Sequence, residues 1–517
     1  MQSPPLARAS RLRASSSRAI ASSWLAPSLL VAIVMLEICS LIARAGRTHF
    51  WYDELLTLHV SALQPFTVLL SALHAGADGM PPAYYVIVRL ARLLPLDSQI
   101  TLRLPSILGY IITLLGVYWF TRKRLTVAAG LTAVLLITQS PFRSCALEAR
   151  SYALIVGFLA VAAVLWQKVD ESRVWMAAFC AFLTAAVACH HLAVVALSIF
   201  AFAEVVRTVL SRGVRWGVWG SFLLAATPFL ASLPMLMHFR AIFGRSFWSL
   251  PDWGTIFSTY RLYVNADVNL GLILAIVILV ACAVALPKMV QRWRNATPEA
   301  HFPIPEVVLI CGFLCYPALL VLLTMLMGSG YVPRYGWPAI FGLASGAVYL
   351  LRNRWRDARL LILPATFFIV FAMRSTADLR PPAAADPNVA SQWWAHLMEA
   401  GRNESTLPIV ITGGAFYLEA VQYAPPSLRD RFVCVVAPDA AVRLTGSDTV
   451  DRGNRILSRF VPLRVEELAR FQSAHRRFLV VSDGGRFDWL TPYLIERKYP
   501  LSFLSRNGDA TLYLAGQ

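Results

Sequence analysis

Two adjacent carboxylic acids, Asp53 and Glu54, follow the first apolar segment of the 517-residue chain, in the sequence RTHFWYDELL. Poor solvation beside an apolar segment raises the proton affinity of a carboxylate, which can then act as a general base. The alternative is that both acids only interact with the dipole of a helix that starts here. We predict that Asp53 and Glu54 are catalytic.

A second polar stretch, SPFRSCALEARSYAL, separates two later apolar segments and contains Arg143, Glu148, Arg150 and Tyr152. The planar guanidinium of arginine can hold a phosphate group through two parallel hydrogen bonds. Arginine and tyrosine also occur as simple anchors at membrane edges. We expect an arginine of this stretch to bind an anionic head group, with Glu148 and Tyr152 as candidate substrate contacts.

A third polar stretch, GSGYVPRYGWP, places Arg334 beside Tyr335 between two apolar segments. Two such stretches, each with an arginine near a tyrosine, favour an anion site to which both contribute. Tyr84 and Tyr85 follow a Pro81–Pro82 step in the first polar stretch and are further candidate substrate contacts.

Histidines occur in the polar stretches together with acids that could join them as metal ligands. The candidates are His49, His59, His74, His190, His191, Asp53 and Glu148. Their spacing matches no known ligand pattern, so we predict no particular metal ligand and leave a divalent metal ion open as a cofactor. The eight cysteines form no Cys-x-x-Cys pair and are expected to be free thiols.

The composition predicts a polytopic membrane protein, because 57% of the residues are hydrophobic, only 15% are charged, and the mean hydropathy is +0.58. The formal net charge is +18. Its arginines lie in short clusters between apolar segments, which is typical of cytoplasmic loops and argues against nucleic-acid binding.

Eleven apolar runs are long enough, or nearly long enough, to cross a hydrocarbon layer of roughly 30 Å. They cover residues 24–43, 104–120, 125–142, 151–167, 174–189, 191–206, 216–237, 268–286, 306–327, 337–351 and 359–373. Residues 81–96 are also apolar, but they are short and contain Arg89 and Arg92, so we expect a helix at the membrane surface or partly inserted. The number of spans is therefore predicted as eleven, with twelve or thirteen as alternatives.

The basic clusters orient these runs, because positively charged loops remain in the cytoplasm. The expected organisation is a cytoplasmic tail at 1–23, a transmembrane domain at 24–374 with a first outer loop at 45–103, and an extracytoplasmic domain at 375–517. A further outer loop at 238–267 is rich in aromatic residues and is expected to cover the membrane interface.

The C-terminal part has a different texture, with β-like runs that alternate with helix-like stretches. The β-like runs are 408–414, 432–437, 477–485 and 510–516, and the helix-like stretches include 415–424 and 464–473. This alternation predicts a small α/β domain.

The order of several short motifs resembles the GT-C superfamily of polyprenyl-phosphate-dependent glycosyltransferases. The motifs are WYDE after the first span, MPPAYY, RLPS at 103–106, EARSYAL, and PRY before a late span. They cover roughly residues 25–350 and are most similar to the bacterial branch related to protein O-mannosyltransferases and the lipid A aminoarabinose transferase. Met80 departs from this pattern, because relatives often have histidine before the Pro–Pro pair.

The resemblance implies a GT-C fold in the bacterial inner (plasma) membrane and an inverting transfer of a hexosyl or pentosyl group. The sugar would pass from a polyprenyl-phosphate donor to a glycan, lipid or protein acceptor on the outer face. It assigns the base to Asp53, with Glu54 beside it, and the donor phosphate to Arg334 and Tyr335 with help from Arg150. Two alternatives remain: a transporter or flippase for a lipid-linked glycan, and a non-catalytic envelope assembly protein.

Overall fold

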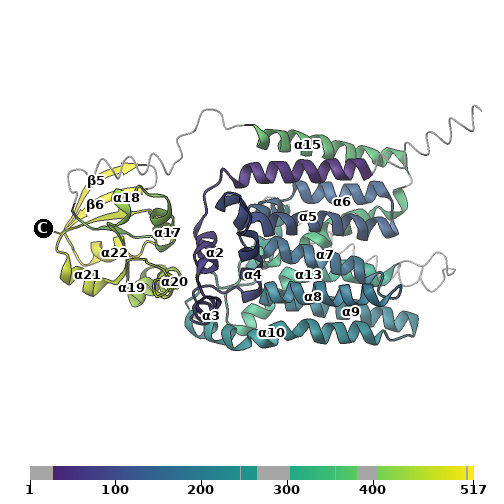
Figure 1. Ribbon diagram of the computed structural model, residues 1–517, viewed down its shortest axis with the longest axis horizontal. Helices are drawn as coiled ribbons and strands as arrows, with labels where there is room; N and C mark the ends of the chain where they lie inside the picture. Colours follow the sequence, from purple (N-terminus) through teal and green to yellow (C-terminus); the bar gives the residue numbers. More distant parts are fainter. Residues whose placement is uncertain are drawn as a thin grey trace, which may run out of the picture.

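The structure is a computed structural model that describes residues 27–244, 246–264, 303–355, 357–380, 406–507 and 510–516. Its helices run side by side along the long axis of the molecule, and a small sheet domain lies at one end of them (Figure 1). Short helices from the N-terminal third of the chain occupy the space between the bundle and the sheet domain.

Among the described residues, six helices are long and apolar enough to cross a membrane. They are Pro27–Ala45, α5 (Ser98–Arg124), His191–Ser211 including α9 (Val194–Ser211), α10 (Trp216–Phe243), α13 (Ile304–Met327) and Arg359–Leu379 including α15 (Ile362–Leu379). Shorter apolar helices are α6 (Val127–Gln139), α8 (Arg173–Cys189) and α14 (Ala339–Leu350). The short helix Pro141–Leu147 and α7 (Tyr152–Trp166) are together long and apolar enough for a seventh span, with a bend of 114° between them. Helices thus coincide with each predicted span except 268–286, which lies outside the described residues.

The predicted first outer loop folds into three short helices, α2 (Tyr52–Ala62), α3 (Phe66–His74) and α4 (Pro82–Ala91). α4 has only 10 residues, whereas a spanning helix needs about 20. Its length therefore fits the expectation that the apolar stretch 81–96 does not cross the membrane. In the aromatic loop at 238–267, α11 (Gly254–Val264) packs against α13.

Two glycines allow α5 and α7 to cross closely. A Cβ atom on Gly157 would lie 2.5 Å from the carbonyl oxygen of Gly109, and a Cβ atom on Gly109 would collide with the backbone of Leu154. Small residues at a contact allow membrane helices to approach this closely. The crossing brings the segment before α7 alongside the first turns of α5, and both regions contribute to the site described below.

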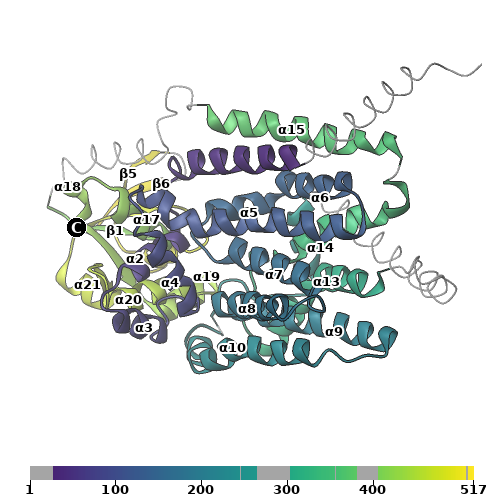
Figure 2. The ribbon, with the colours of Figure 1, turned by 45° about the vertical axis from the view of Figure 1, so that its right-hand side comes forward.

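The first and last long helices lie side by side in two views (Figures 1 and 2). Glu37 of the first helix pairs with Arg143 at a distance of 2.8 Å between Oε2 and Nε. The Arg143 guanidinium also reaches Asp378 of α15, with 2.9 Å between Nη1 and Oδ2. A buried acid is costly unless it is paired, so this network accounts for Glu37 and uses Arg143 as a structural cation.

The C-terminal domain contains a six-stranded sheet with the order β3-β2-β1-β4-β6-β5. The strands are β1 (Ile409–Ile411), β2 (Phe432–Val436), β3 (Val465–Glu467), β4 (Phe478–Ser482), β5 (Leu501–Asn507) and β6 (Ala510–Ala515). β3, β2, β1 and β4 pair in parallel, whereas β6 is antiparallel to both β4 and β5. The sequence predicts four of these strands and misses β3 and β5. The predicted helix-like stretch 464–473 is wrong in its first part, because Val465–Glu467 form β3 and the helix α21 begins only at Leu468.

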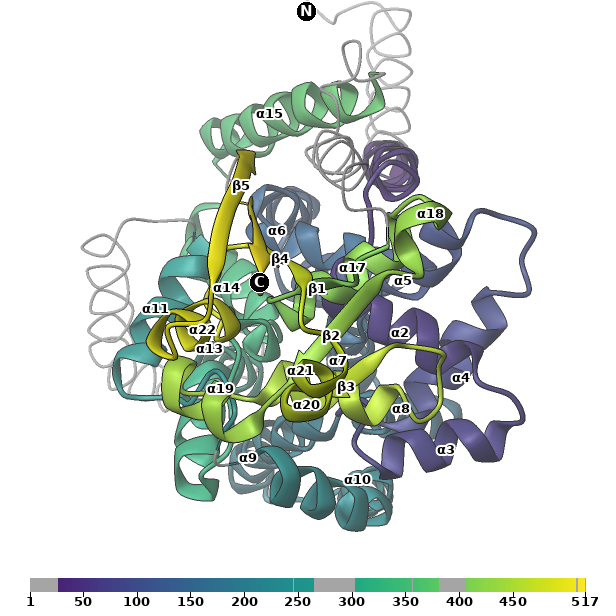
Figure 3. The ribbon, with the colours of Figure 1, turned by 90° about the vertical axis from the view of Figure 1, so that its left-hand side faces the viewer.

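Helices cover the sheet and connect it to the membrane part. They are α17 (Gly414–Tyr423), α18 (Pro426–Arg429), α19 (Pro438–Thr445), α20 (Thr449–Leu457), α21 (Leu468–Ala474) and α22 (Leu490–Glu496). Figure 3 looks onto this domain and shows α17 next to α2, with which it is in contact. The predicted helix at 415–424 is therefore confirmed as α17.

Candidate active site

Asp53 and Arg334 form an ion pair between two loops that are 281 residues apart in the sequence. Asp53 lies in the first turn of α2, and Arg334 lies in the short helix η4 (Pro333–Gly336), between α13 and α14. Their side chains are 15% and 18% exposed, so both remain reachable from outside the bundle. The predicted acid and the predicted phosphate-binding cation are thus brought together.

Aromatic rings surround the Arg334 guanidinium, which lies 4.7 Å from the ring centre of Trp51 and 5.6 Å from that of Tyr152. The Tyr335 ring lies next to Tyr152 and 5.4 Å from the His190 ring. Burial lowers the pKa of His190 to about 3, so its imidazole is neutral and does not add a second charge. Tyr152, Tyr335 and His190 line a small cavity beside Arg334.

Arg334 retains a hydrogen-bond donor, because its buried Nε–H has no partner within the described part of the chain. The Asp53 carboxylate raises the pKa of Arg334, as do the neighbouring tyrosines, although burial opposes the effect. The residue is therefore a fixed cation with a free N–H, a combination suited to an anionic oxygen.

Glu54 does not line this cavity and is 1% exposed. Its Oε1 and Oε2 accept hydrogen bonds of 2.7 Å from Nε and Nη2 of Arg103, and Oε1 also accepts the backbone N–H of Ala149 at 2.7 Å. A bidentate arginine and a backbone amide together hold the carboxylate in one fixed orientation. The arrangement fixes α2 to the start of α5 and to the segment before α7.

The other donors of Arg103 hold the chain that leads into α2. Its Nη1 and Nη2 groups donate to the carbonyl oxygens of Ala45, Thr48 and His49 at 2.8, 2.7 and 3.0 Å. Every N–H of the guanidinium is thus used, and the side chain is 0% exposed.

Arg150 is also paired with an acid. Its Nη1 and Nη2 donate to Oδ2 and Oδ1 of Asp78 at 2.6 and 3.1 Å, and Nη1 also reaches the carbonyl oxygen of Asp53 at 3.2 Å. The Tyr85 hydroxyl donates to the same Asp78 carboxylate at 2.5 Å. Asp78 therefore neutralises Arg150, and the arginine braces the backbone of Asp53.

Glu148 is a second acid near the ion pair, and its Oε2 is buried without a hydrogen-bond partner among the described residues. Burial, and to a lesser degree the negative charges of Glu54 and Asp53, raise the pKa of Glu148 to about 7, although Arg334 lowers it. The carboxyl group can therefore change its protonation state near neutral pH beside Asp53 and Arg334.

The remaining predicted substrate contacts differ in their accessibility. Tyr152 lines the cavity beside Arg334, whereas Tyr84 and Tyr85 are both 0% exposed. The Tyr84 hydroxyl is buried and has no partner in the described segments. In the structure Tyr85 contributes through Asp78, and neither Tyr84 nor Tyr85 lines the cavity.

The candidate metal ligands do not converge. Within the described ranges, no three His, Cys, Asp or Glu side chains come close enough to hold a metal ion. Met80 packs inside, and its sulfur accepts a hydrogen bond from the Ser151 hydroxyl at 3.4 Å.

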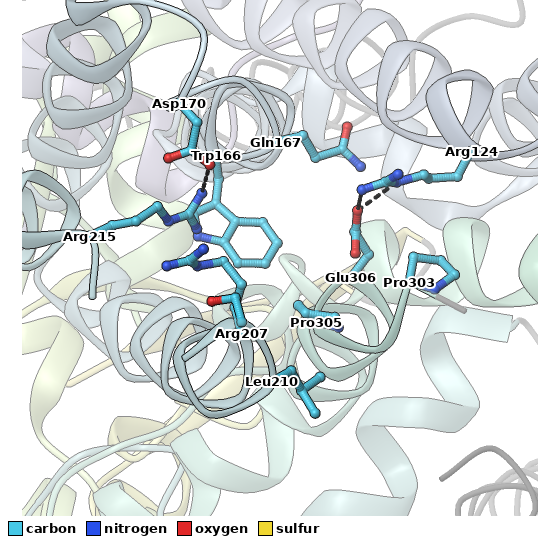
Figure 4. Close-up of a pocket in the computed structure, with 11 residues that line it drawn as sticks. Arg124, Trp166, Gln167, Asp170, Arg207, Leu210, Arg215, Pro303, Pro305 and Glu306 are labelled. Atoms are coloured by element: carbon cyan, nitrogen blue, oxygen red, sulfur yellow. Dashed lines mark hydrogen bonds and ion pairs between the residues drawn. The ribbon is translucent and has the colours of Figure 1, made fainter. Parts of the chain in front are cut away.

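A larger pocket lies at the opposite ends of the helices and is lined by both cations and acids (Figure 4). Arg124 pairs there with Glu306, and Arg215 pairs with Asp170. Arg124 is about 30 Å along α5 from Arg103, so this pocket is separate from the Asp53–Arg334 pair.

Two residues of the site, Arg103 and Asp78, are not assigned by the sequence patterns. Arg103 carries a detectable signal, because an arginine at the start of an apolar run must be paired or lie near water. Asp78 stands between glycines in a polar stretch, and nothing in its local pattern indicates a partner at position 150.

No protein-family model and no curated protein matches the sequence. Among solved structures, ArnT from Cupriavidus metallidurans bound to undecaprenyl phosphate is 14% identical, with a TM-score of 0.54 over 96% of this chain and 98% of ArnT. The same protein in the apo state has the same identity and coverage and a TM-score of 0.55.

These similarities confirm the predicted fold class. The chain shares the fold of ArnT; it is mostly helical and includes a small C-terminal sheet domain. Together with its apolar helices, they support a multi-pass membrane protein. An identity of 14% describes the fold and leaves the reaction to be argued from the site.

Proposed function

We propose that this protein is a membrane glycosyltransferase that moves a sugar from a polyprenyl-phosphate donor to an acceptor on the outer face of the inner membrane. The observation that carries the proposal is the pairing of Asp53 with Arg334 at the end of the helix bundle. A proton acceptor and a phosphate-binding cation side by side are the two groups that such a transfer needs. The undecaprenyl phosphate bound to ArnT supports the class of lipid carrier.

The proposed reaction is a direct displacement at the anomeric carbon. An acceptor hydroxyl attacks this carbon while Asp53 takes its proton, and the bond from the carbon to the phosphate oxygen breaks. The bonding electrons leave with the polyprenyl phosphate, whose growing negative charge is stabilised by Arg334. A single displacement inverts the anomeric centre.

The roles of the neighbouring residues follow from their contacts. Glu54 is fully engaged by Arg103 and Ala149, so we assign it to holding α2 and assign the base to Asp53. Arg150 is paired with Asp78 and its side chain is only 6% exposed, whereas that of Arg334 is 18% exposed, so we assign Arg150 to bracing Asp53 and leave the phosphate to Arg334. Tyr335 and Tyr152 shape the cavity, and Glu148 is proposed to contact the substrate in its protonated form.

The acids buried in the helices argue against the alternative of a transporter. Transport of a charged group requires free charges deep in the spans. Glu37 is paired with Arg143, and Glu204 with Arg207 and Arg215. We infer that these pairs join helices and do not carry a substrate.

The test is the release of labelled sugar from a panel of hexosyl and pentosyl polyprenyl phosphates by the purified protein in lipid vesicles, with membrane extract as the acceptor. Asp53→Asn is compared with wild type and with Asp97→Asn, which changes an exposed acid of the same outer loop. We expect turnover to be lost in Asp53→Asn and retained in Asp97→Asn.

Normal turnover in Asp53→Asn would refute the assignment of the base. Absence of turnover with every donor, together with donor movement across the vesicle membrane, would instead favour a transporter. Either result is interpretable only if the variants bind donor and unfold at the same temperature as wild type.

A further inference from the structure

The segment just before Asp53 contacts the C-terminal domain, in addition to Arg103 of the membrane part. α17 of that domain packs against α2, and residues 49–52 lie in the contact between them. This contact connects the C-terminal sheet domain to the segment just before Asp53, the proposed base. The geometry of the contact therefore affects the position of Asp53.

Tyr423 at the end of α17 makes two of the contacts. Its hydroxyl oxygen accepts the backbone N–H of Phe50 at 2.5 Å. Its ring stacks on the His49 ring, with 4.1 Å between the ring centres and 14° between the planes. The ring and the hydroxyl therefore fix two consecutive residues.

Glu419, one turn earlier in α17, faces the start of α2: burial raises the pKa of its carboxyl group, and the interaction with the backbone N–H of Tyr52 opposes this effect. The first N–H groups of a helix lack partners within the helix. The N-cap residue of α2 is Trp51, whose indole has no oxygen that could accept them. The Glu419 carboxyl group of another domain thus faces the backbone N–H of the first residue of α2.

The Tyr52 side chain extends the contact into α20, since its hydroxyl donates to the carbonyl oxygen of Val450 at 3.5 Å. Asp53 is the next residue. The Asp53 carboxylate pairs with Arg334. The preceding residues His49, Phe50 and Tyr52 contact the C-terminal domain.

We propose that Glu419 and Tyr423 are positioning residues for the transfer reaction, which hold residues 49–52 so that Asp53 is aimed at Arg334. The inference rests on the proposed function for the role of Asp53. The C-terminal domain would then affect catalysis through the position of Asp53, although none of its described residues lines the cavity.

The test compares Glu419→Leu, Glu419→Gln and Tyr423→Phe with the matched control Glu467→Leu, which changes an exposed acid on β3 of the same domain. Leucine at 419 removes the acceptor, so kcat should fall about tenfold with an unchanged KM for the donor. Glutamine keeps an acceptor oxygen and should restore kcat to within about threefold of wild type. Tyr423→Phe should also lower kcat, whereas Glu467→Leu should not.

Amide hydrogen exchange provides a readout that does not depend on turnover. Glu419→Leu should speed exchange of a peptide that covers residues 49–55, and should leave the strands of the sheet domain unchanged. Glu467→Leu should change neither region.

Equal kcat and equal exchange in Glu419→Leu and Glu467→Leu would overturn the inference. So would a Glu419→Gln variant as slow as Glu419→Leu, because the hydrogen bond would then not be the cause. If Glu419→Leu fails to fold, a normal kcat and normal exchange at 49–55 in Tyr423→Phe would have the same effect. Failure of the proposed function is a separate result: wild type would lack turnover while the exchange data still decide the contact.

Discussion

Removal of the Arg103 side chain tests whether the buried pair with Glu54 organises the first outer loop. In Arg103→Met, the Glu54 carboxylate would remain buried beside Ala149 with no cation, and three backbone carbonyl groups would lose their donors. The methionine has a similar length and leaves no large cavity, so the loss is mainly electrostatic.

The expected cost follows from the burial of the pair. Both side chains are at most 1% exposed, and breaking a buried ion pair by removing one partner typically costs about 3–5 kcal/mol. A solvent-exposed pair contributes about 0–1 kcal/mol. Lys123–Glu171 is such a pair on the same helix, with side chains 31% and 54% exposed.

The assay is denaturant-induced unfolding in detergent micelles, followed by the fluorescence of the 15 tryptophans. Arg103→Met should lower the free energy of unfolding by about 3–5 kcal/mol, and Lys123→Met by less than about 1 kcal/mol. Adding Glu54→Gln to Arg103→Met should recover part of the loss, because it removes the stranded charge.

A cost for Arg103→Met that matches that of Lys123→Met would refute the reasoning. So would a double variant that is less stable than Arg103→Met, since the stranded carboxylate would then not be the source of the loss.

Three further changes have defined outcomes. Gly109→Ala should destabilise the protein by more than about 1 kcal/mol, because the new methyl group meets the backbone of Leu154, whereas Gly220→Ala, with open space, should be neutral; both are read from unfolding curves. Burial raises the pKa of Glu148 from 4.5 to about 7, so the folded protein loses stability relative to the unfolded chain as the pH rises through this range. Glutamine does not ionise, so the free energy of unfolding of Glu148→Gln relative to wild type should increase by about 3 kcal/mol from pH 5 to pH 8. Arg334→Lys should lower donor turnover about tenfold or more, because lysine cannot form the planar contact; unchanged turnover would remove Arg334 from the phosphate site.

The apolar runs predict most of the membrane helices because hydrophobic length is a property of a single segment. The same local logic finds β1, β2 and β4, whose residues are mostly β-branched or aromatic and buried, and also the less buried β6. It misses β3 and β5, since β3 contains two acids and is not buried, and β5 depends on pairing with β6 for its structure.

The site is harder to predict than the fold because its groups come together only in three dimensions. Asp53 and Arg334 have the right chemistry in the sequence, and only the structure places them in contact. Glu54 and Arg150 carry the same charges as Asp53 and Arg334. Glu54 is neutralised by Arg103, 49 residues away in the sequence, and Arg150 by Asp78, 72 residues away. A local pattern cannot distinguish an accessible charged group from one that is buried against its partner.

The contact between Tyr423 and Phe50 also has a consequence for biosynthesis. These residues are 373 positions apart, so the ribosome must translate most of the chain before the start of α2 can meet its partner. A product that ends before α17 could insert its helices and would still lack the contacts that order residues 49–52. Completion of the polypeptide and completion of this segment therefore coincide, and a prematurely terminated chain would be left without the contacts that we propose orient Asp53.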